Sequence, residues 1–300
     1  MTNLKWLQLI RERRQIEPVT LPPDASARLT ELKDIRAVVF DVYGTLFSSG
    51  VGDISLATEE NRDAALRRVL LENDILINEA ASTLRFDEVL HQIIHLHQEK
   101  RRAGGVEYPE VEIRAVWSDF LDTLVASKHA EIPESIDVET LVIDYETRVN
   151  PTQPMPGLSE MLAELRARGI VFSIISNAQF YTPLLFEAFL GKDIAALGFC
   201  PKCNVWSYAE LEGKPSEQLY RIAAQRLMAH HEISPEQCLY LGNDMRNDIW
   251  PAQALGFRTA LFAGDKLSLR RREEEAAGKD QHPDLEITEL SQIQTLIRAR

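Results

Sequence analysis

Long apolar runs are missing from this sequence. No stretch is long and apolar enough to span a membrane. The first residues lack the apolar core of a signal peptide, because Arg11, Arg13 and Arg14 follow soon after Trp6 and Leu7. We therefore expect a cytoplasmic protein without a membrane partner.

Cysteine is scarce as well. The 300 residues include three cysteines, too few for a disulfide framework, and this favours a reducing compartment. Cys200 and Cys203 have the spacing of a zinc or redox pair, but no second pair accompanies them and Cys238 is the one cysteine left. The sequence alone therefore favours no metal or redox role for the pair.

Basic residues are outnumbered by acidic ones. With 33 lysines and arginines against 46 aspartates and glutamates, the formal net charge is −13, which argues against nucleic acid as a partner. A small anionic substrate would have to be held by local positive charge. Hydrophobic residues at 45% and charged residues at 26% are ordinary for a soluble enzyme with a sizeable core.

The most informative segment runs from residue 37 to residue 46. An uninterrupted apolar run precedes Asp41, a pattern typical of a central parallel strand covered on both faces. Gly44 supplies a turn without a side chain in the way. Because open α/β sheets bind ligands at this edge, Asp41 is a candidate nucleophile; the alternative is that it caps the turn.

The chain divides into a flank, a helical block and a region of alternating strands and helices. The pattern of residues 1 to about 35 predicts an amphipathic helix, a break at Pro22 and Pro23, and a second short helix that reaches Leu32. After Asp41 the strand signals stop, and helical patterns predict an all-helical insert at residues 59–73, 86–102, 111–127 and 139–149.

From residue 151 onward, helices and strands alternate. Strands are predicted at 170–175, near 205, at 238–241, 258–262 and 285–288, with helices at 157–168, 215–228, 248–255 and 290–299. This order predicts an α/β fold with a doubly wound, Rossmann-like parallel sheet.

Several polar residues follow these strands and should converge. Since parallel strands end at one edge of a sheet, Asp41, Ser176 with Asn177, and the loop Gly242–Asp248 should face one crevice. Lys214 precedes a helix start, where an ammonium group is unfavourable unless it faces carboxylates or a bound anion.

The loop after residue 242 is acidic. Asp244 and Asp248 lie one helical turn apart and can face one point near Asp41. Each like-charge pair at about 4 Å costs on the order of 4 kcal/mol unless Lys214 or a cation neutralises it. Carboxylate ligands of this kind suit Mg²⁺; the alternative is that both residues are helix caps.

In this order, the segments 41–46, 176–177, 214–215 and 242–248 resemble the four motifs of the haloacid dehalogenase-like hydrolase superfamily. The resemblance implies a core of residues 1–48 and 151–300, with 1–35 as a helical flank, and a cap domain of residues 49–150. It also implies roles for individual residues. The catalytic residues would be Asp41, Lys214, Thr45 and Ser176; the substrate-binding residues Gly44, Ser176, Asn177 and Tyr43; and the Mg²⁺ ligands Asp41, the backbone carbonyl of Tyr43, Asp244 and Asp248.

The motifs point to two branches of this superfamily. Tyr43 replaces the second aspartate of the phosphatases, and the first motif is similar to that of the 2-haloacid dehalogenases. The acidic loop is more similar to the phosphatases, although Asn243 stands where many of them have the first aspartate. We expect a Mg²⁺-dependent phosphatase that acts on a small phosphorylated metabolite through an aspartyl-phosphate intermediate.

Two alternatives stay open. One is a metal-independent 2-haloacid dehalogenase with an aspartyl-ester intermediate, for which Arg62, Arg67 and Arg68 are candidate leaving-group residues. The other is a binding protein of the same fold with impaired catalysis.

The run of three arginines at 270–272, followed by three glutamates, favours a solvated helix face. The oligomeric state is left open.

Overall fold

The computed structural model describes residues 4–14, 17–49, 59–275 and 281–298. Its centre is a parallel sheet with the strand order β6-β5-β2-β7-β8-β9. These strands are β2 (Ala37–Phe40), β5 (Val171–Ser176), β6 (Val205–Trp206), β7 (Cys238–Gly242), β8 (Arg258–Phe262) and β9 (Leu285–Ile287). The α/β class and the parallel sheet predicted from the sequence are confirmed.

Strand β2 lies in the middle of the sheet and is buried along its length. Val38 and Phe40 point into one hydrophobic core, while Ala37 and Val39 point into a second core on the other face. The two-residue period of a strand thus divides this apolar run between two helical layers.

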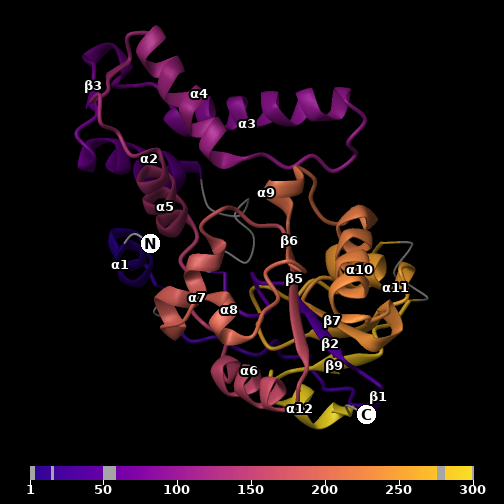
Figure 1. Cartoon of the computed structure of the whole chain (residues 1–300). Coiled ribbons are helices and arrows are strands. Elements are labelled where there is room, and N and C mark those ends of the chain that lie inside the picture. Colours follow the sequence, from indigo (N-terminus) through magenta and orange to yellow (C-terminus); the bar gives the residue numbers. More distant parts are fainter. Residues whose placement is uncertain (1–3, 15–16, 50–58, 276–280, 299–300) are drawn as a thin grey trace.

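Helices cover both faces of the sheet (Figure 1). The first core includes residues of α6 (Leu158–Ala167), α7 (Thr182–Leu190) and α12 (Gln292–Leu296); the second includes residues of α10 (Glu217–His231) and α11 (Trp250–Ala254). Short helices α8 (Ile194–Leu197) and α9 (Ser207–Glu210) flank β6 in the sequence. A π-helical turn, Met245–Ile249, joins β7 to α11.

The block between β2 and α6 is helical, as predicted. It contains α2 (Glu59–Glu72), α3 (Phe86–Ala103), α4 (Ile113–Ala126) and α5 (Val138–Val149). A short antiparallel pair, β3 (Leu76–Ile77) with β4 (Ala130–Glu131), accompanies the helices and was not predicted. Figure 1 shows this insert above the end of the sheet where β6 and α9 lie. The insert therefore covers the carboxyl ends of the strands.

The N-terminal helix α1 (Leu4–Glu12) lies between the insert and the core. Trp6 Nε1 donates to Thr140 Oγ1 of α5 at 2.9 Å, and Arg11 Nε donates to the carbonyl of Ala188 in α7 at 2.6 Å. This flank joins both parts of the molecule.

Both chain ends differ from the sequence expectation. The predicted second helix up to Leu32 is wrong, because the described residues 17–31 contain no helix and the backbone of Arg28 pairs with that of Glu286 in β9. The predicted helix at 290–299 is too long. It ends at Leu296, where the chain becomes β10 (Ile297–Arg298) and pairs with β1 (Leu32–Lys33). Strand pairing across the two ends overrides the local helical pattern.

Candidate active site

The carboxyl ends of β2, β5 and β7 meet beneath the insert. The backbone N–H of Asp41 donates to the carbonyl of Leu241 at 2.9 Å, which fixes the first turn beside β7. Ser176 ends β5, and Asn243 and Asp244 follow β7. The predicted convergence of these residues is present in the structure.

The Asp41 carboxylate is buried and almost surrounded by donors. Lys214 Nζ lies 2.6 Å from Oδ1, and Ser176 Oγ donates to the same oxygen at 3.0 Å. Thr45 Oγ1 lies 3.1 Å from Oδ2. Two donors therefore occupy both lone pairs of Oδ1, while Oδ2 keeps one lone pair with which it can attack an electrophile.

Lys214 connects Asp41 to a second buried acid. Its Nζ lies 2.6 Å from Oδ1 of Asp248, and its backbone N–H donates to Oδ1 of Asn177 at 2.7 Å. Burial opposes the charge on this lysine, but Asp248 and Asp41 outweigh it and raise the Lys214 pKa. The ammonium group therefore stays charged and serves both carboxylates.

Asp248 accepts four hydrogen bonds. Besides Lys214, the donors are the hydroxyl of Tyr240 at 2.9 Å and the backbone N–H groups of Asn243 and Asp244, both at 3.0 Å. Burial raises the Asp248 pKa and the Lys214 charge opposes that shift; we take the carboxylate as ionised because both oxygens face donors. Asp248 therefore holds Lys214 and the loop in place.

Glycine is required at two positions around these acids. Gly44 has a φ of +84°, and a Cβ there would lie 2.7 Å from Asn243 Nδ2 and from Ser268 Cβ. A Cβ on Gly242 would lie 2.4 Å from the carboxyl carbon of Asp248. The first turn and the acidic loop thus pack against each other too closely for any side chain.

Asp244 is neutralised by an arginine that sequence reasoning missed. Arg272 Nη2 lies 2.6 Å from Oδ2 of Asp244, and Arg272 Nε lies 3.1 Å from Oδ1. Oδ1 also accepts the backbone N–H groups of Arg246 and Asn247, so Asp244 caps the π-helical turn. The alternative reading of Asp244 as a helix cap is therefore observed.

The solvated helix face expected for residues 270–272 is wrong. Arg270, Arg271 and Arg272 lie outside any helix; Arg271 pairs with Glu286, and Arg272 pairs with Asp244. The neighbouring glutamates made the run look self-compensating in sequence. The backbone of Arg270 pairs with Asn243 and Met245, and this pairing brings the run to the active site.

A cavity of about 410 Å³ lies between this cluster and the insert. Asp41, Lys214, Arg270 and Arg272 line its core side. The insert and its connecting segment contribute Ile94, Gln98, Glu110, Val111, Ile113 and Glu146. Among the described residues that line the cavity, the cations come from the core, and the insert contributes two carboxylic acids, Glu110 and Glu146.

Glu146 of α5 is the second residue that sequence reasoning missed. Its carboxyl accepts a hydrogen bond from the hydroxyl of Tyr181 at 3.3 Å. Its pKa is raised to about 7, mainly by burial; the Tyr181 hydrogen bond opposes this shift and the nearby Glu110 adds to it. A carboxylic acid that exchanges protons near neutral pH therefore faces the cavity of Asp41.

Tyr43 lies within electrostatic range of both Glu146 and Asp41. Its hydroxyl lies 3.0 Å from Thr182 Oγ1, and burial raises its pKa well above the usual value. The phenol therefore stays protonated and lines the cavity as a neutral group. Of the other predicted substrate-binding residues, Asn177 lines the cavity, whereas Gly44 and Ser176 are not among the described residues that line it.

Comparison with known proteins identifies the family. The model of the haloacid dehalogenase-like hydrolases matches residues 35–256, and the chain belongs to this family of hydrolases. The resemblance stated from the four motifs is thus confirmed. A search of curated proteins found no match.

Solved structures share the fold at low identity. A 2-haloacid dehalogenase from Pseudomonas syringae pv. Tomato DC3000 is 18% identical, with a TM-score of 0.53 over 87% of this chain and 97% of that one. A HAD phosphatase from Thermococcus onnurineus is 16% identical, with a TM-score of 0.49 over 87% and 97%. At such low identity the likeness to the dehalogenase shows the fold alone and does not decide the reaction.

Within the described part of the chain, no helix has the length and apolar character needed to cross a membrane.

Proposed function

We propose that this protein hydrolyses a small phosphate ester through an aspartyl-phosphate intermediate on Asp41. The observation that carries the proposal is the position of Glu146, whose raised pKa gives it a proton to donate near neutral pH. An alkoxide leaving group needs such a proton, whereas a halide does not. Glu146 would take the place of the aspartate that Tyr43 replaces.

In the first step, Oδ2 of Asp41 attacks phosphorus and the ester P–O bond breaks. Protonated Glu146 transfers its proton to the departing alkoxide, so that an alcohol leaves and a glutamate carboxylate remains. Lys214, Arg270 and Arg272 line the cavity and offset the negative charge of the phosphoryl oxygens.

In the second step, water attacks the phosphorus of the aspartyl phosphate. The Glu146 carboxylate accepts the proton of that water, and the bond between phosphorus and Oδ2 breaks. Phosphate leaves with one oxygen from the water. Asp41 and protonated Glu146 are restored.

The predicted Mg²⁺ site fits poorly with the donors in this cavity. Arg272 occupies both oxygens of Asp244, and Lys214, Tyr240 and two backbone N–H groups occupy those of Asp248. Mg²⁺ requires carboxylate oxygens that are open to it. We therefore infer that the protein's own cations supply the countercharge.

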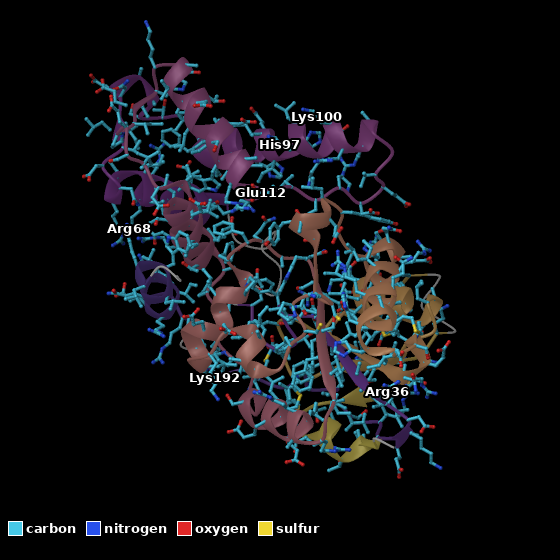
Figure 2. All side chains as sticks on the ribbon, in the orientation of Figure 1. Arg36, Arg68, His97, Lys100, Glu112 and Lys192 are labelled. Atoms are coloured by element: carbon cyan, nitrogen blue, oxygen red, sulfur yellow. The ribbon has the colours of Figure 1, made fainter. Side chains whose placement is uncertain are left out.

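The cavity also bears on the dehalogenase alternative. Arg67 bonds to Asp63, and Arg68 pairs with Glu72 on the outer side of the insert (Figure 2). None of the candidates Arg62, Arg67 and Arg68 is among the described residues that line the cavity. Because none of these three arginines reaches the cavity, the leaving-group residue that a dehalogenase would need is missing from its described lining, and this favours a phosphate ester over a short haloacid.

Turnover assays separate the candidates. Phosphate release from p-nitrophenyl phosphate and from an alkyl phosphate supports the proposal, and chloride release from 2-chloropropionate overturns it in favour of dehalogenation. If Asp41→Asn changes neither rate but the protein binds phosphate, the protein is the binding protein of the third hypothesis.

A further inference from the structure

Cys200, Cys203 and His231 come together at the opposite end of the sheet from Asp41. Their ligand atoms, two Sγ atoms and one imidazole nitrogen, all lie within 4.8 Å of one another. The backbone N–H of Cys200 donates to the carbonyl of Phe172, near the start of β5, whereas Ser176 at the other end of β5 contacts Asp41. The cluster is thus separate from the candidate active site.

The local backbone brings the two sulfur atoms together. Residues 200–203 form a tight turn in which the N–H groups of Cys203 and Asn204 both donate to the carbonyl of Cys200. Histidine 231 is the last residue of α10, and its carbonyl accepts a hydrogen bond from Arg36. Figure 2 shows Arg36 at the end of the molecule that is farthest from the insert.

A second observation points to a ligand at this place. Nε2 of His231 is buried and has no hydrogen-bond partner among the described residues. A buried ring nitrogen without a partner is costly, and a metal ion bonded to it would remove that cost. The nitrogen belongs to the same residue that completes the cluster with the two thiols.

We propose that Cys200, Cys203 and His231 bind a Zn²⁺ ion that fastens the end of α10 to the edge of the sheet. Ligand atoms in a tetrahedral zinc site lie roughly 3.5–4 Å apart, so a small closure of the observed cluster suffices. Each thiol releases its proton when the Zn–S bond forms, and two thiolates balance the charge of the ion. Water completes the fourth position, because Cys200 is partly exposed.

Zinc fits better than a catalytic dithiol. Burial raises the Cys203 pKa, and Cys200 raises it further, so the free thiol is a poor nucleophile. Arg226 and Arg36 lie close enough to affect Cys203 and His231, and their charges repel a bare cation. Formation of two thiolates removes that obstacle, which makes the site selective for a thiophilic ion.

Metal analysis of untagged protein from zinc-supplemented medium tests the proposal. We expect one equivalent of zinc in the wild type, loss of most of it in Cys200→Ser and His231→Gln, and retention in the controls Cys238→Ser and His230→Gln. Cys238 is a buried cysteine outside the cluster, and His230 is the exposed neighbour. Binding of Co²⁺ should give a thiolate-to-metal charge-transfer band that the same two variants lose.

Chelation should lower the melting temperature of the wild type by roughly 5 °C or more and leave His231→Gln unchanged. Equal zinc contents in all five proteins would overturn the proposal, as would a wild type that takes up no zinc. A mass two hydrogens below the reduced chain, with no metal, would mean a Cys200–Cys203 disulfide instead. Activity assays play no part, so the result is independent of the proposed hydrolysis.

Discussion

Arg272 holds Asp244 in a two-point ion pair, with Nη2 2.6 Å from Oδ2 and Nε 3.1 Å from Oδ1. The carboxylate that the sequence assigned to Mg²⁺ is thereby neutralised within the chain. We expect turnover of p-nitrophenyl phosphate to persist in EDTA. Loss of activity in EDTA and its recovery with Mg²⁺ would show that the ion displaces Arg272.

Replacement of Arg272 should create a metal response. In Arg272→Gln, Asp244 loses its partner and adds uncompensated negative charge beside Asp41, so we expect about a tenfold loss in kcat/KM. Addition of Mg²⁺ should restore part of the lost kcat/KM. Arg246→Gln is the control, because the Arg246 side chain is exposed and lies 4.0 Å from Glu275. Initial rates with and without Mg²⁺ measure both effects, and identical responses of the two variants would refute this role of Arg272.

The ammonium group of Lys214 supplies the positive charge that balances two buried carboxylates. Lys214→Met leaves Asp41 and Asp248 without a countercharge, and we expect a loss of about 3–5 kcal/mol in the free energy of unfolding, together with loss of activity. Addition of Asp248→Asn should restore part of the stability but none of the activity. Urea unfolding measures the change.

Lys192 provides the matched control for this substitution. It is exposed on the surface, as Figure 2 shows, so Lys192→Met should change stability by no more than about 0.5 kcal/mol. A Lys214→Met protein as stable as this control would contradict the buried ion-pair arrangement.

Glu146→Gln should separate substrates by their leaving groups. Without the proton donor, we expect kcat/KM for an alkyl phosphate to fall by about 10² to 10⁴, and that for p-nitrophenyl phosphate to fall far less. Wild-type activity on alkyl phosphates should decline as pH rises through about 7, the Glu146 pKa. The variant should lose that decline.

Glu110 is the control for Glu146 because it lines the same cavity. Its carboxyl accepts hydrogen bonds from the backbone N–H of Val111 and from Ser207 Oγ. Glu110→Gln should therefore lower kcat/KM by the same factor for both substrates. An equal loss for both substrates in Glu146→Gln would assign Glu146 a structural role.

Ionisation of Glu146 should also affect stability. The folded-state pKa of about 7 lies above the usual 4.5, so the neutral form is favoured in the folded protein. The stability that this group contributes is present below pH 4.5 and is lost as pH rises toward 7. Between pH 5 and pH 8, the free energy of unfolding of Glu146→Gln should rise by up to about 3 kcal/mol relative to that of the wild type. Chemical unfolding at both pH values measures the gain, and a constant difference would contradict it.

The centre of the fold was predictable because its signals are local. Strands β2, β5 and β7 are largely apolar runs that end at polar residues, and parallel strands share one edge, so the convergence of Asp41 and Ser176 followed from the sequence. The pairing of β1 with β10 was not predictable. It joins the two ends of the chain through a tertiary contact that no local pattern records.

The positions of Asp41 and Lys214 in the site were predictable, but those of the groups around them were not. Arg272 reaches Asp244 because a segment far along the chain folds back, and its run of charges looked like a solvated helix face. Glu146 is one acid on a long insert helix, and its proximity to Tyr181 depends on how that helix packs. No short motif could have marked either residue.

A single turnover in ¹⁸O water, followed by mass spectrometry of the product and of the Asp41 peptide, distinguishes attack at phosphorus from attack at the carboxyl carbon. We expect one ¹⁸O atom in the released phosphate and none in Asp41, because water attacks phosphorus. Label in the Asp41 carboxylate would contradict it, because water would then have attacked the carboxyl carbon of an aspartyl ester.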